Sequence, residues 1–303
     1  MTYMIDVFKK IAFACSLTAF LTACNGESNS EKPQVATNEN ANVVTGRIPQ
    51  EVKRLEFPKL KGGNSIVLVH KTNDRYGVNY STEWDTQLSA QRWSCYQMYD
   101  SNSGGHVGRY DTSSGYPNDE LLPTDYQLQS DPYYRSGFDH GHICPSADRQ
   151  YSKEANRQTF FLTNMQPQFK EFNQVDYLWE QMEEQVRSWN TSSFRDTLYV
   201  VKGGTIDNGL ILQYLTRGTT RIPVPKYFFV AILCKNQAGY KALGFWFEHK
   251  KYAKKRNLGD YVKSIDELEN LTHIDFFCNL PDNIESHVEN LSVDNIKRAW
   301  GLR

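Results

Sequence analysis

The sequence has almost no excess charge of either sign. Its 34 Lys and Arg residues are balanced by 35 Asp and Glu residues, which gives a formal net charge of −1. Proteins that bind nucleic acid are often basic, because phosphate contacts release counterions. The overall charge therefore gives no support to such a partner, although a local basic stripe would be sufficient to bind one.

Two other features are missing. No repeat of the period found in solenoids or propellers is present. The four cysteines that follow Cys24 also include no C-x-x-C pair of the kind that binds zinc. They allow three complete disulfide pairings, and the sequence does not choose among them. These four residues are Cys95, Cys144, Cys234 and Cys278. We interpret Cys144, two residues after His142, as a packing residue or half of a disulfide rather than as a nucleophile.

An apolar run lies near the N-terminus, and it is short for a membrane span. Lys9 and Lys10 precede apolar residues 11–21, and small residues follow, a pattern that predicts a secretory signal over residues 1–23. The segment Leu21-Thr22-Ala23-Cys24 resembles the bacterial lipobox. This resemblance implies lipidation at Cys24 and export as a lipoprotein, whereas the alternative is a plain signal peptide. Asn25 after the cysteine favours the outer membrane.

The rest of the chain predicts a tether and one domain. Residues 24–45 are mostly polar, which is typical of a flexible tether. Residues 46–303 have globular composition and predict a single α+β domain. Runs rich in β-branched and aromatic residues predict strands at 65–70, 93–99, 159–163, 197–202, 227–233 and 242–247. Helical periodicity predicts a helix over 173–189, and a capping box predicts another over 264–270.

The densest group of chemically capable residues begins at Asp139-His140-Gly141-His142. Imidazole has a proton affinity suited to a general base near neutral pH, so His142 is a candidate for activating a water. Asp139 is close enough to hold the turn. Taken alone the tetrapeptide is a weak signal, because a lone histidine in such a sequence is more often structural or incidental.

Residues on either side would complete a phosphodiester-hydrolysing site. Asn173 offers an amide oxygen, a ligand that suits Mg²⁺ if phosphate and water supply the rest, although an asparagine near a helix start is also a common cap. Arg109 lies in the polar stretch 101–138 and could stabilise a phosphate charge. Arg135 and Arg149 flank the motif and are candidates for contacts with a nucleic-acid backbone.

Several motifs in order resemble the DNA/RNA non-specific endonuclease family, which includes secreted bacterial nucleases and mitochondrial endonuclease G. They are D-x-G-H at 139–142, T-N-x-x-P-Q at 163–168, F-N at 172–173 and W-x-x-M-E at 179–183. The resemblance extends over most of the chain after about residue 65. It implies a ββα-metal core with a central antiparallel sheet flanked by helices. It also implies a metal-dependent endonuclease that hydrolyses DNA and RNA without sequence preference and leaves 5′-phosphates.

Carried over by position, the resemblance implies a role for each matching residue. His142 is the general base, Asn173 is the direct ligand of Mg²⁺ (with Mn²⁺ as a substitute), and Asn164 is an amide that positions the site. Arg109 stabilises phosphate. The expected partner is the DNA or RNA backbone, and the oligomeric state stays open, with a homodimer as one option.

Two positions depart from the family pattern. His140 stands where the family usually has arginine; we expect it to contact phosphate when protonated and to favour activity at mildly acidic pH. The helix also places its acid two residues later than the family does. We align Glu183 with the family glutamate that holds the metal through water, but on an unbroken helix Glu180 or Glu184 would share the face of Asn173.

Two alternatives remain from the sequence. The chain could capture nucleic acid without cutting it, with His140 marking a lost activity. It could also be a zinc hydrolase that uses His140 and His142, although no third ligand at a familiar spacing is evident.

Overall fold

The computed structural model describes residues 37–103 and 105–303 of the chain. The predicted signal at 1–23 and the lipidation site Cys24 lie outside the described residues. Among the described helices, none combines the length and apolar character that crossing a membrane requires.

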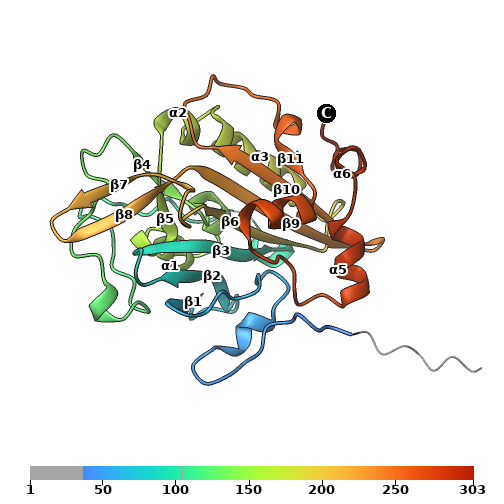
Figure 1. Ribbon diagram of the computed structural model, residues 1–303, viewed down its shortest axis with the longest axis horizontal. Helices are drawn as coiled ribbons and strands as arrows, with labels where there is room; N and C mark the ends of the chain where they lie inside the picture. Colours follow the sequence, from blue (N-terminus) through green and yellow to red (C-terminus); the bar gives the residue numbers. More distant parts are fainter. Residues whose placement is uncertain (1–36, 104) are drawn as a thin grey trace, which may run out of the picture. The chain divides into compact units, whose positions relative to one another are not determined.

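A seven-stranded antiparallel sheet forms the centre of the fold (Figure 1). Its strands, in spatial order, are β1 (Ser65–Lys71), β2 (Val78–Asp85), β3 (Ala90–Met98), β6 (Thr197–Gly204), β9 (Tyr227–Asn236), β10 (Gly239–Glu248) and β11 (Val262–Lys263). Two hairpins lie outside this sheet. They are β4 (Asp139–His142) with β5 (Met165–Gln168), and β7 (Ile211–Arg217) with β8 (Thr220–Pro225).

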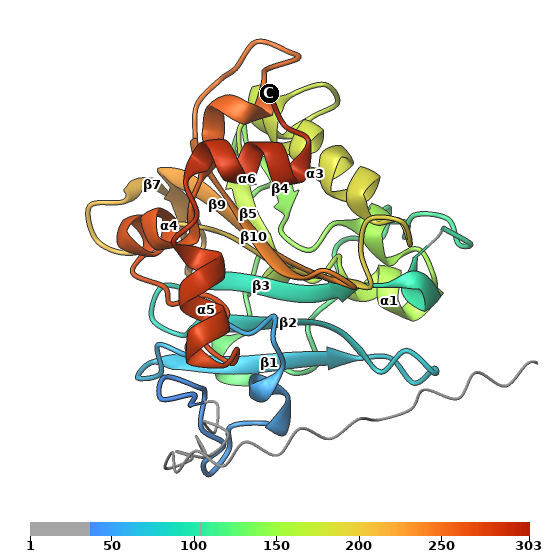
Figure 2. The ribbon, with the colours of Figure 1, turned by 90° about the vertical axis from the view of Figure 1, so that its right-hand side faces the viewer.

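Helices pack on both faces of the central sheet (Figures 1 and 2). The α-helices are α1 (Lys153–Gln158), α2 (Lys170–Asn173), α3 (Leu178–Trp189), α4 (Ile265–Thr272), α5 (Asp282–Glu289) and α6 (Val293–Trp300). One core contains buried side chains of α2, α3 and α6, and the other contains those of α4 and α5. In β6, Leu198 and Val200 join the first core, while Val201 joins the second. A strand covered on both faces has a nearly continuous apolar sequence, which is why β6 could be predicted.

The prediction of a strand at 159–163 is wrong. The backbone N–H groups of Thr159, Phe160 and Phe161 donate to carbonyl oxygens three residues earlier, so the chain continues as turns from the end of α1. Phe160 and Phe161 are buried although they do not lie in a strand. Their apolar character reflects this burial, and the strand β5 begins only at Met165.

The predicted helix over 173–189 is in fact two helices. α2 ends at Asn173, Gln174 is extended, and Asp176 has a left-handed φ of 69° before α3 starts at Leu178. The Glu180 carboxylate accepts a hydrogen bond from the Asp176 backbone N–H at 3.2 Å, which stabilises this break. The apolar period is confirmed within α3, but Val175 is 67% exposed.

The other predicted helix is confirmed as α4. The Ser264 side chain accepts from the Glu267 N–H, and the Glu267 side chain accepts from the Ser264 N–H, which forms the predicted capping box.

The packed region begins before residue 46, where the predicted tether was expected to end. Asn38 donates to the Leu280 carbonyl at 2.8 Å, and the buried Asn42 donates to the carbonyls of Val52 and Pro58. Within the described residues the tether is therefore shorter than expected.

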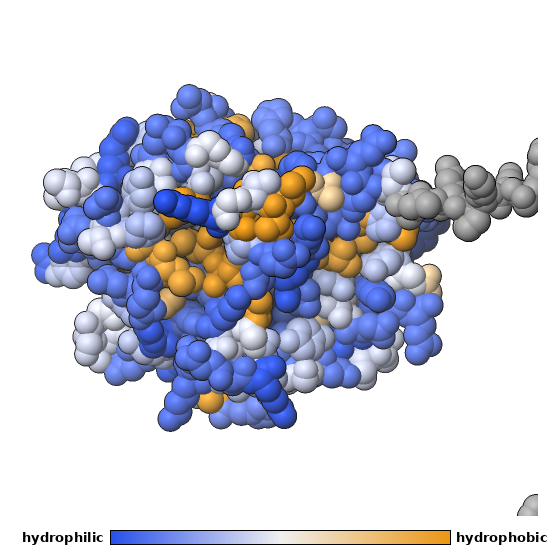
Figure 3. Space-filling model, turned by 90° about the horizontal axis from the view of Figure 1, so that it is seen from below, coloured by the Kyte–Doolittle hydropathy of each residue, from blue (hydrophilic) through white to orange (hydrophobic). Residues whose placement is uncertain are grey.

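The surface seen from below Figure 1 is largely hydrophilic, with apolar residues gathered near its centre (Figure 3). The edge strand β1 is only partly covered, since Ile66, Val67 and Val69 are half-buried.

Each of the four cysteines in the described residues, Cys95, Cys144, Cys234 and Cys278, is a buried free thiol. Burial raises the pKa of Cys144 to about 11, so its thiol stays protonated and inert near neutral pH. Cys144 is therefore a packing residue.

Candidate active site

One pocket of about 620 Å³ brings together residues that the sequence analysis selected from distant segments. They are Arg109, His140, His142, Asn173, Glu180 and Glu183. The two histidines come from β4, Asn173 ends α2, and the glutamates lie on α3. Glu184 lines a separate hollow, so the structure favours Glu183 or Glu180 as the acid of this site.

The hairpin that carries the histidines depends on a close approach at Gly141. Gly141 lies opposite Gln166 in the β4–β5 pairing, and the side chain of Gln168 crosses its α-carbon. A β-carbon at Gly141 would lie 2.5 Å from Gln168 Cγ and would also overlap Cδ and Oε1. Any larger residue therefore requires either the hairpin or the Gln168 side chain to move.

The orientation of the His142 imidazole follows from its hydrogen bond. Nδ1 lies 3.2 Å from the carbonyl oxygen of His140, and because a carbonyl only accepts, Nδ1 carries the proton. Nε2 is then left with a lone pair, and it has no hydrogen-bond partner in the described structure. Burial, with a further contribution from the positive charge of Arg109, lowers the pKa of His142 to about 3. The ring is thus a neutral acceptor near neutral pH.

Asp139 fixes the orientation of the Asn173 amide. Its Oδ2 accepts from Asn173 Nδ2 at 3.2 Å and from Gln174 Nε2 at 3.1 Å. Because a carboxylate only accepts, the amide nitrogen must face Asp139 and the oxygen Oδ1 must point elsewhere. Asn173 is half-buried and lines the pocket, so Oδ1 remains available for a ligand.

Glu183 belongs to a buried charge network behind the pocket. Its Oε1 lies 3.5 Å from Nζ of the fully buried Lys202, and its Oε2 lies 3.9 Å from Arg187. Arg187 also contacts Asp148 at 3.3 Å. Burial raises the pKa of Glu183 to about 7, although Lys202 opposes the shift. Lys202 was not predicted from the sequence, where its only signal is a lysine within the apolar run of β6.

The three arginines are placed differently. Arg109 is exposed, lines the pocket, and lies over the Phe160 ring at 4.7 Å, while the His142 ring meets the same phenyl group edge-on. Arg135 is exposed but does not line this pocket. The expectation that Arg149 contacts phosphate is wrong, because its side chain is fully buried against Tyr96.

His140 is held by aromatic and acidic neighbours that the sequence analysis did not select. Its ring stacks between Tyr116 and Tyr133, with centroid distances of 4.1 and 4.3 Å. Nε2 lies 3.1 Å from both carboxylate oxygens of Asp131. Burial alone would raise the pKa of Asp131, but the hydrogen bond and charge of His140, the Tyr133 N–H and the charge of Arg217 together lower it. His140 therefore lines the pocket with its ring held in place by Tyr116, Tyr133 and Asp131.

Asn164 is fully buried and positions the end of β4. Its Oδ1 accepts from the Cys144 N–H at 2.9 Å, and its Nδ2 donates to the carbonyls of Cys144 and Thr159. The Ser94 hydroxyl oxygen also lies 3.3 Å from Oδ1. Asn164 does not line the pocket, so its place corresponds to a positioning residue.

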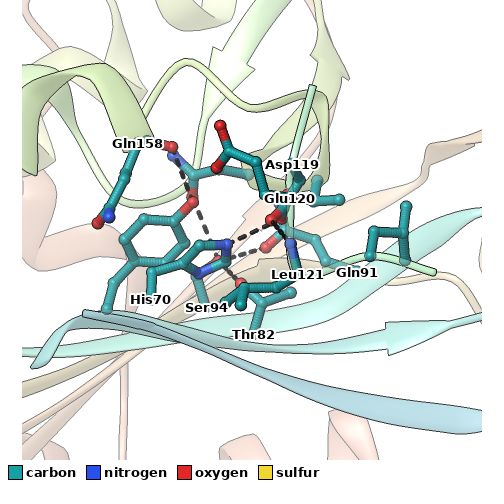
Figure 4. Close-up of polar contacts among 12 residues, drawn as sticks. His70, Thr82, Gln91, Ser94, Asp119, Glu120, Leu121 and Gln158 are labelled. Carbon is teal, nitrogen blue, oxygen red and sulfur yellow. Dashed lines mark hydrogen bonds and ion pairs between the residues drawn. The ribbon is translucent and has the colours of Figure 1, made fainter. Parts of the chain in front are cut away.

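Ser94 connects Asn164 to a wider buried polar network (Figure 4). Ser94 lies 2.8 Å from the Thr82 hydroxyl and donates to Gln91. In the same view His70 of β1 lies 2.8 Å from the Asp119 carboxylate, and both side chains are buried (Figure 4). The hairpin is thus joined to the central sheet by buried polar contacts, although His70 Nδ1 and Gln91 Nε2 have no hydrogen-bond partner in the described structure.

The chain matches known nucleases. The profile of the DNA/RNA non-specific endonuclease family matches residues 65–283. A nuclease of Nostoc sp. is 28% identical over 225 residues, covering 71% of this chain and 77% of the relative. The mitochondrial nuclease of Saccharomyces cerevisiae is 30% identical over 182 residues, covering 56% and 55%. The human mitochondrial nuclease EXOG is 26% identical over 237 residues, covering 75% and 62%. The chain thus spans little more than half of the yeast protein.

A solved structure shows the same fold. The EndoG chain of a crystal structure of the EndoG/EndoGI complex aligns with a TM-score of 0.58 at 20% identity, covering 72% of this chain and 89% of that one. The α+β class and the ββα-metal core are confirmed, with the β4–β5 hairpin followed by α2. The matches support a hydrolytic endonuclease. With the family profile matching well over half of its length, the chain belongs to the DNA/RNA non-specific endonuclease family.

Proposed function

We propose that this chain is a metal-dependent endonuclease that hydrolyses phosphodiester bonds in DNA and RNA, with His142 as the general base and Asn173 as the metal ligand. One observation carries the proposal most strongly. The unpaired Nε2 lone pair of His142 and the oriented amide of Asn173 belong to residues that line the same pocket.

His142 would take a proton from the attacking water. Its proton on Nδ1 is held by the His140 carbonyl, so only Nε2 can accept another. A pKa of about 3 makes a weak base, but Arg109 contributes to that low value. A phosphate bound beside Arg109 would offset the positive charge and raise the proton affinity of His142 when substrate is present.

The residues present fit a hard divalent cation, for which Mg²⁺ is the proposed ion and Mn²⁺ a substitute. Asn173 offers Oδ1 directly, Glu183 would support the ion through water, and both are oxygen donors of the type that Mg²⁺ prefers. When bound, such a cation polarises a phosphoryl oxygen and stabilises the leaving oxyanion. Asp139 keeps the amide in the ligand orientation, and Lys202 holds Glu183 in the pocket wall.

Arg109 would bind the scissile phosphate, with its guanidinium supported on the Phe160 ring. Contacts of this kind would fall on the backbone and carry no sequence information, which supports the proposed action on both DNA and RNA. The proposed products carry 5′-phosphates. His140 would add a phosphate contact when protonated.

The proposed place of action is the bacterial outer membrane, with the chain anchored by lipid on Cys24. The lipobox-like segment before Cys24 supports this proposal. Expression of the full chain with a labelled fatty acid tests it. The parent should carry label in the membrane fraction and Cys24→Ser should not, whereas label on both or neither would contradict it.

A metal-depletion experiment tests the proposed function. Supercoiled plasmid and single-stranded RNA are incubated with the chain after treatment with EDTA, and then with Mg²⁺, Mn²⁺ or Zn²⁺ restored. Cleavage of both substrates should return with Mg²⁺ or Mn²⁺. Intact plasmid under every condition would instead indicate a protein that only binds, and recovery with Zn²⁺ alone would indicate a zinc hydrolase.

A further inference from the structure

Three carboxylates converge on the face of the sheet opposite α3. Asp266 and Glu269 lie on α4, and Glu289 ends α5, beside α4 in the fold (Figure 2). One oxygen of each lies within 4.8 Å of an oxygen of each of the others. α4 and α5 belong to the second core, whereas the pocket with His142 is built on the first.

No basic side chain neutralises this group. Among the described residues, no Lys, Arg or His nitrogen lies within 4.0 Å of any of the three carboxylates. The Glu269 carboxylate accepts a hydrogen bond from the Phe276 N–H at 2.7 Å. Ionised carboxylates this close repel one another strongly where burial reduces the screening by water.

Glu289 adds an independent observation. Its side chain is only 8% exposed, and its Oε1 is buried without a hydrogen-bond partner in the described structure. A buried carboxylate oxygen without a partner is costly, so it requires either a proton or a cation.

The chemistry of the donors identifies the kind of ion. Only carboxylate oxygens are offered, which excludes the nitrogen and sulfur ligands that zinc and copper favour. At Ca–O distances of about 2.3–2.6 Å, two oxygens on opposite sides of one calcium ion are roughly 5 Å apart. The 4.8 Å limit on the three oxygens is compatible with this separation, and a set of three carboxylates favours calcium, because Mg²⁺ usually keeps several waters and is bound by only one or two carboxylates.

We propose that Asp266, Glu269 and Glu289 bind a calcium ion that joins α4 to α5, separate from the nuclease pocket. Its role is structural, because it replaces the repulsion between the two helices with shared ligands. Asp275 and Glu285 lie close enough to add to the negative potential, and Asn40 donates to both of them at 3.1 Å.

Calcium titration of the EDTA-treated chain at pH 8 tests the proposal, with calorimetry for affinity and thermal unfolding for stability. The parent should bind one calcium ion and its Tm should rise. Asp266→Asn and Glu289→Gln should each weaken the affinity by about tenfold or more. Glu248→Gln is the matched control, since Glu248 is exposed and pairs only with Lys250; it should respond like the parent.

The Asn173→Ala variant separates this proposal from the proposed function. It should keep the calcium response even if it loses nuclease activity. Loss of calcium binding in Asn173→Ala with retention in Glu289→Gln would place the ion in the nuclease pocket and overturn the proposal. Absence of any calcium response in the parent, or an equal rise in the Tm of Asn173→Ala with Mg²⁺ and with Ca²⁺, would overturn it as well.

Discussion

Replacement of Gly141 by alanine should displace the hairpin that carries His142. The added β-carbon would lie 2.5 Å from Gln168 Cγ, whereas nonpolar atoms at rest are about 3.5–4.0 Å apart. The two strands must therefore separate by roughly 1 Å, or Gln168 must leave its buried position. Overpacking of this kind costs about 1–3 kcal/mol in the free energy of unfolding.

Activity should suffer more than stability, because a catalytic group misplaced by about 1 Å can lower the rate about 100-fold. The measurements are urea unfolding and the initial rate of plasmid nicking at saturating Mg²⁺. Gly141→Ala should unfold at lower urea and nick plasmid about 100-fold more slowly.

Gln168→Ala provides the matched test of the cause. It removes the Cγ, Cδ and Oε1 atoms that the new β-carbon would meet, and the Gln168 amide has no hydrogen-bond partner to lose in the described structure. The double variant Gly141→Ala/Gln168→Ala should therefore recover most of the lost rate. Parent-like stability and rate in Gly141→Ala alone, or no recovery in the double variant, would refute the reasoning.

Three further predictions concern the pocket. Asp139→Ala frees the Asn173 amide to rotate, so the Mg²⁺ concentration for half-maximal nicking should rise about 10- to 100-fold, and an unchanged value would contradict the assigned role. Because the pKa of Glu183 is raised to about 7, its side chain becomes protonated as the pH falls, and kcat/KM should decline below neutral pH. Higher Mg²⁺ concentrations should move the midpoint of this decline to lower pH. If the pH profile of Glu183→Gln has the same shape as that of the parent, Glu183 is not the group that titrates. If protonated His140 binds phosphate, KM should rise with pH in the parent as that charge is lost, but not in His140→Arg, which stays charged. Identical dependence of KM on pH in the two proteins would rule out the contact.

The residues of the candidate site could largely be predicted, because they lie in short sequence motifs with fixed spacing. His142, Asn173 and Glu183 come from three segments, yet the structure brings them to one pocket. The helical spacing of apolar residues in α3 could also be predicted, since these residues all face one core.

The errors arose where tertiary contacts decide the local structure. The four-residue strands β4 and β5 contain no β-branched residue, so their pairing has no local signal. The break before α3 contains neither Gly nor Pro and depends on the contact between Glu180 and Asp176. Arg149 looked like a surface cation, but the ring of Tyr96 and the Gln97 carbonyl hold it in the interior.

The most direct test of the account is the rate of plasmid cleavage by His142→Ala beside the parent, with and without EDTA. The parent should cut only when Mg²⁺ is present. His142→Ala should cut about 10²- to 10⁴-fold more slowly, the range expected for loss of a general base, while its Tm stays near that of the parent. Cleavage by His142→Ala at the parental rate would contradict the central claim.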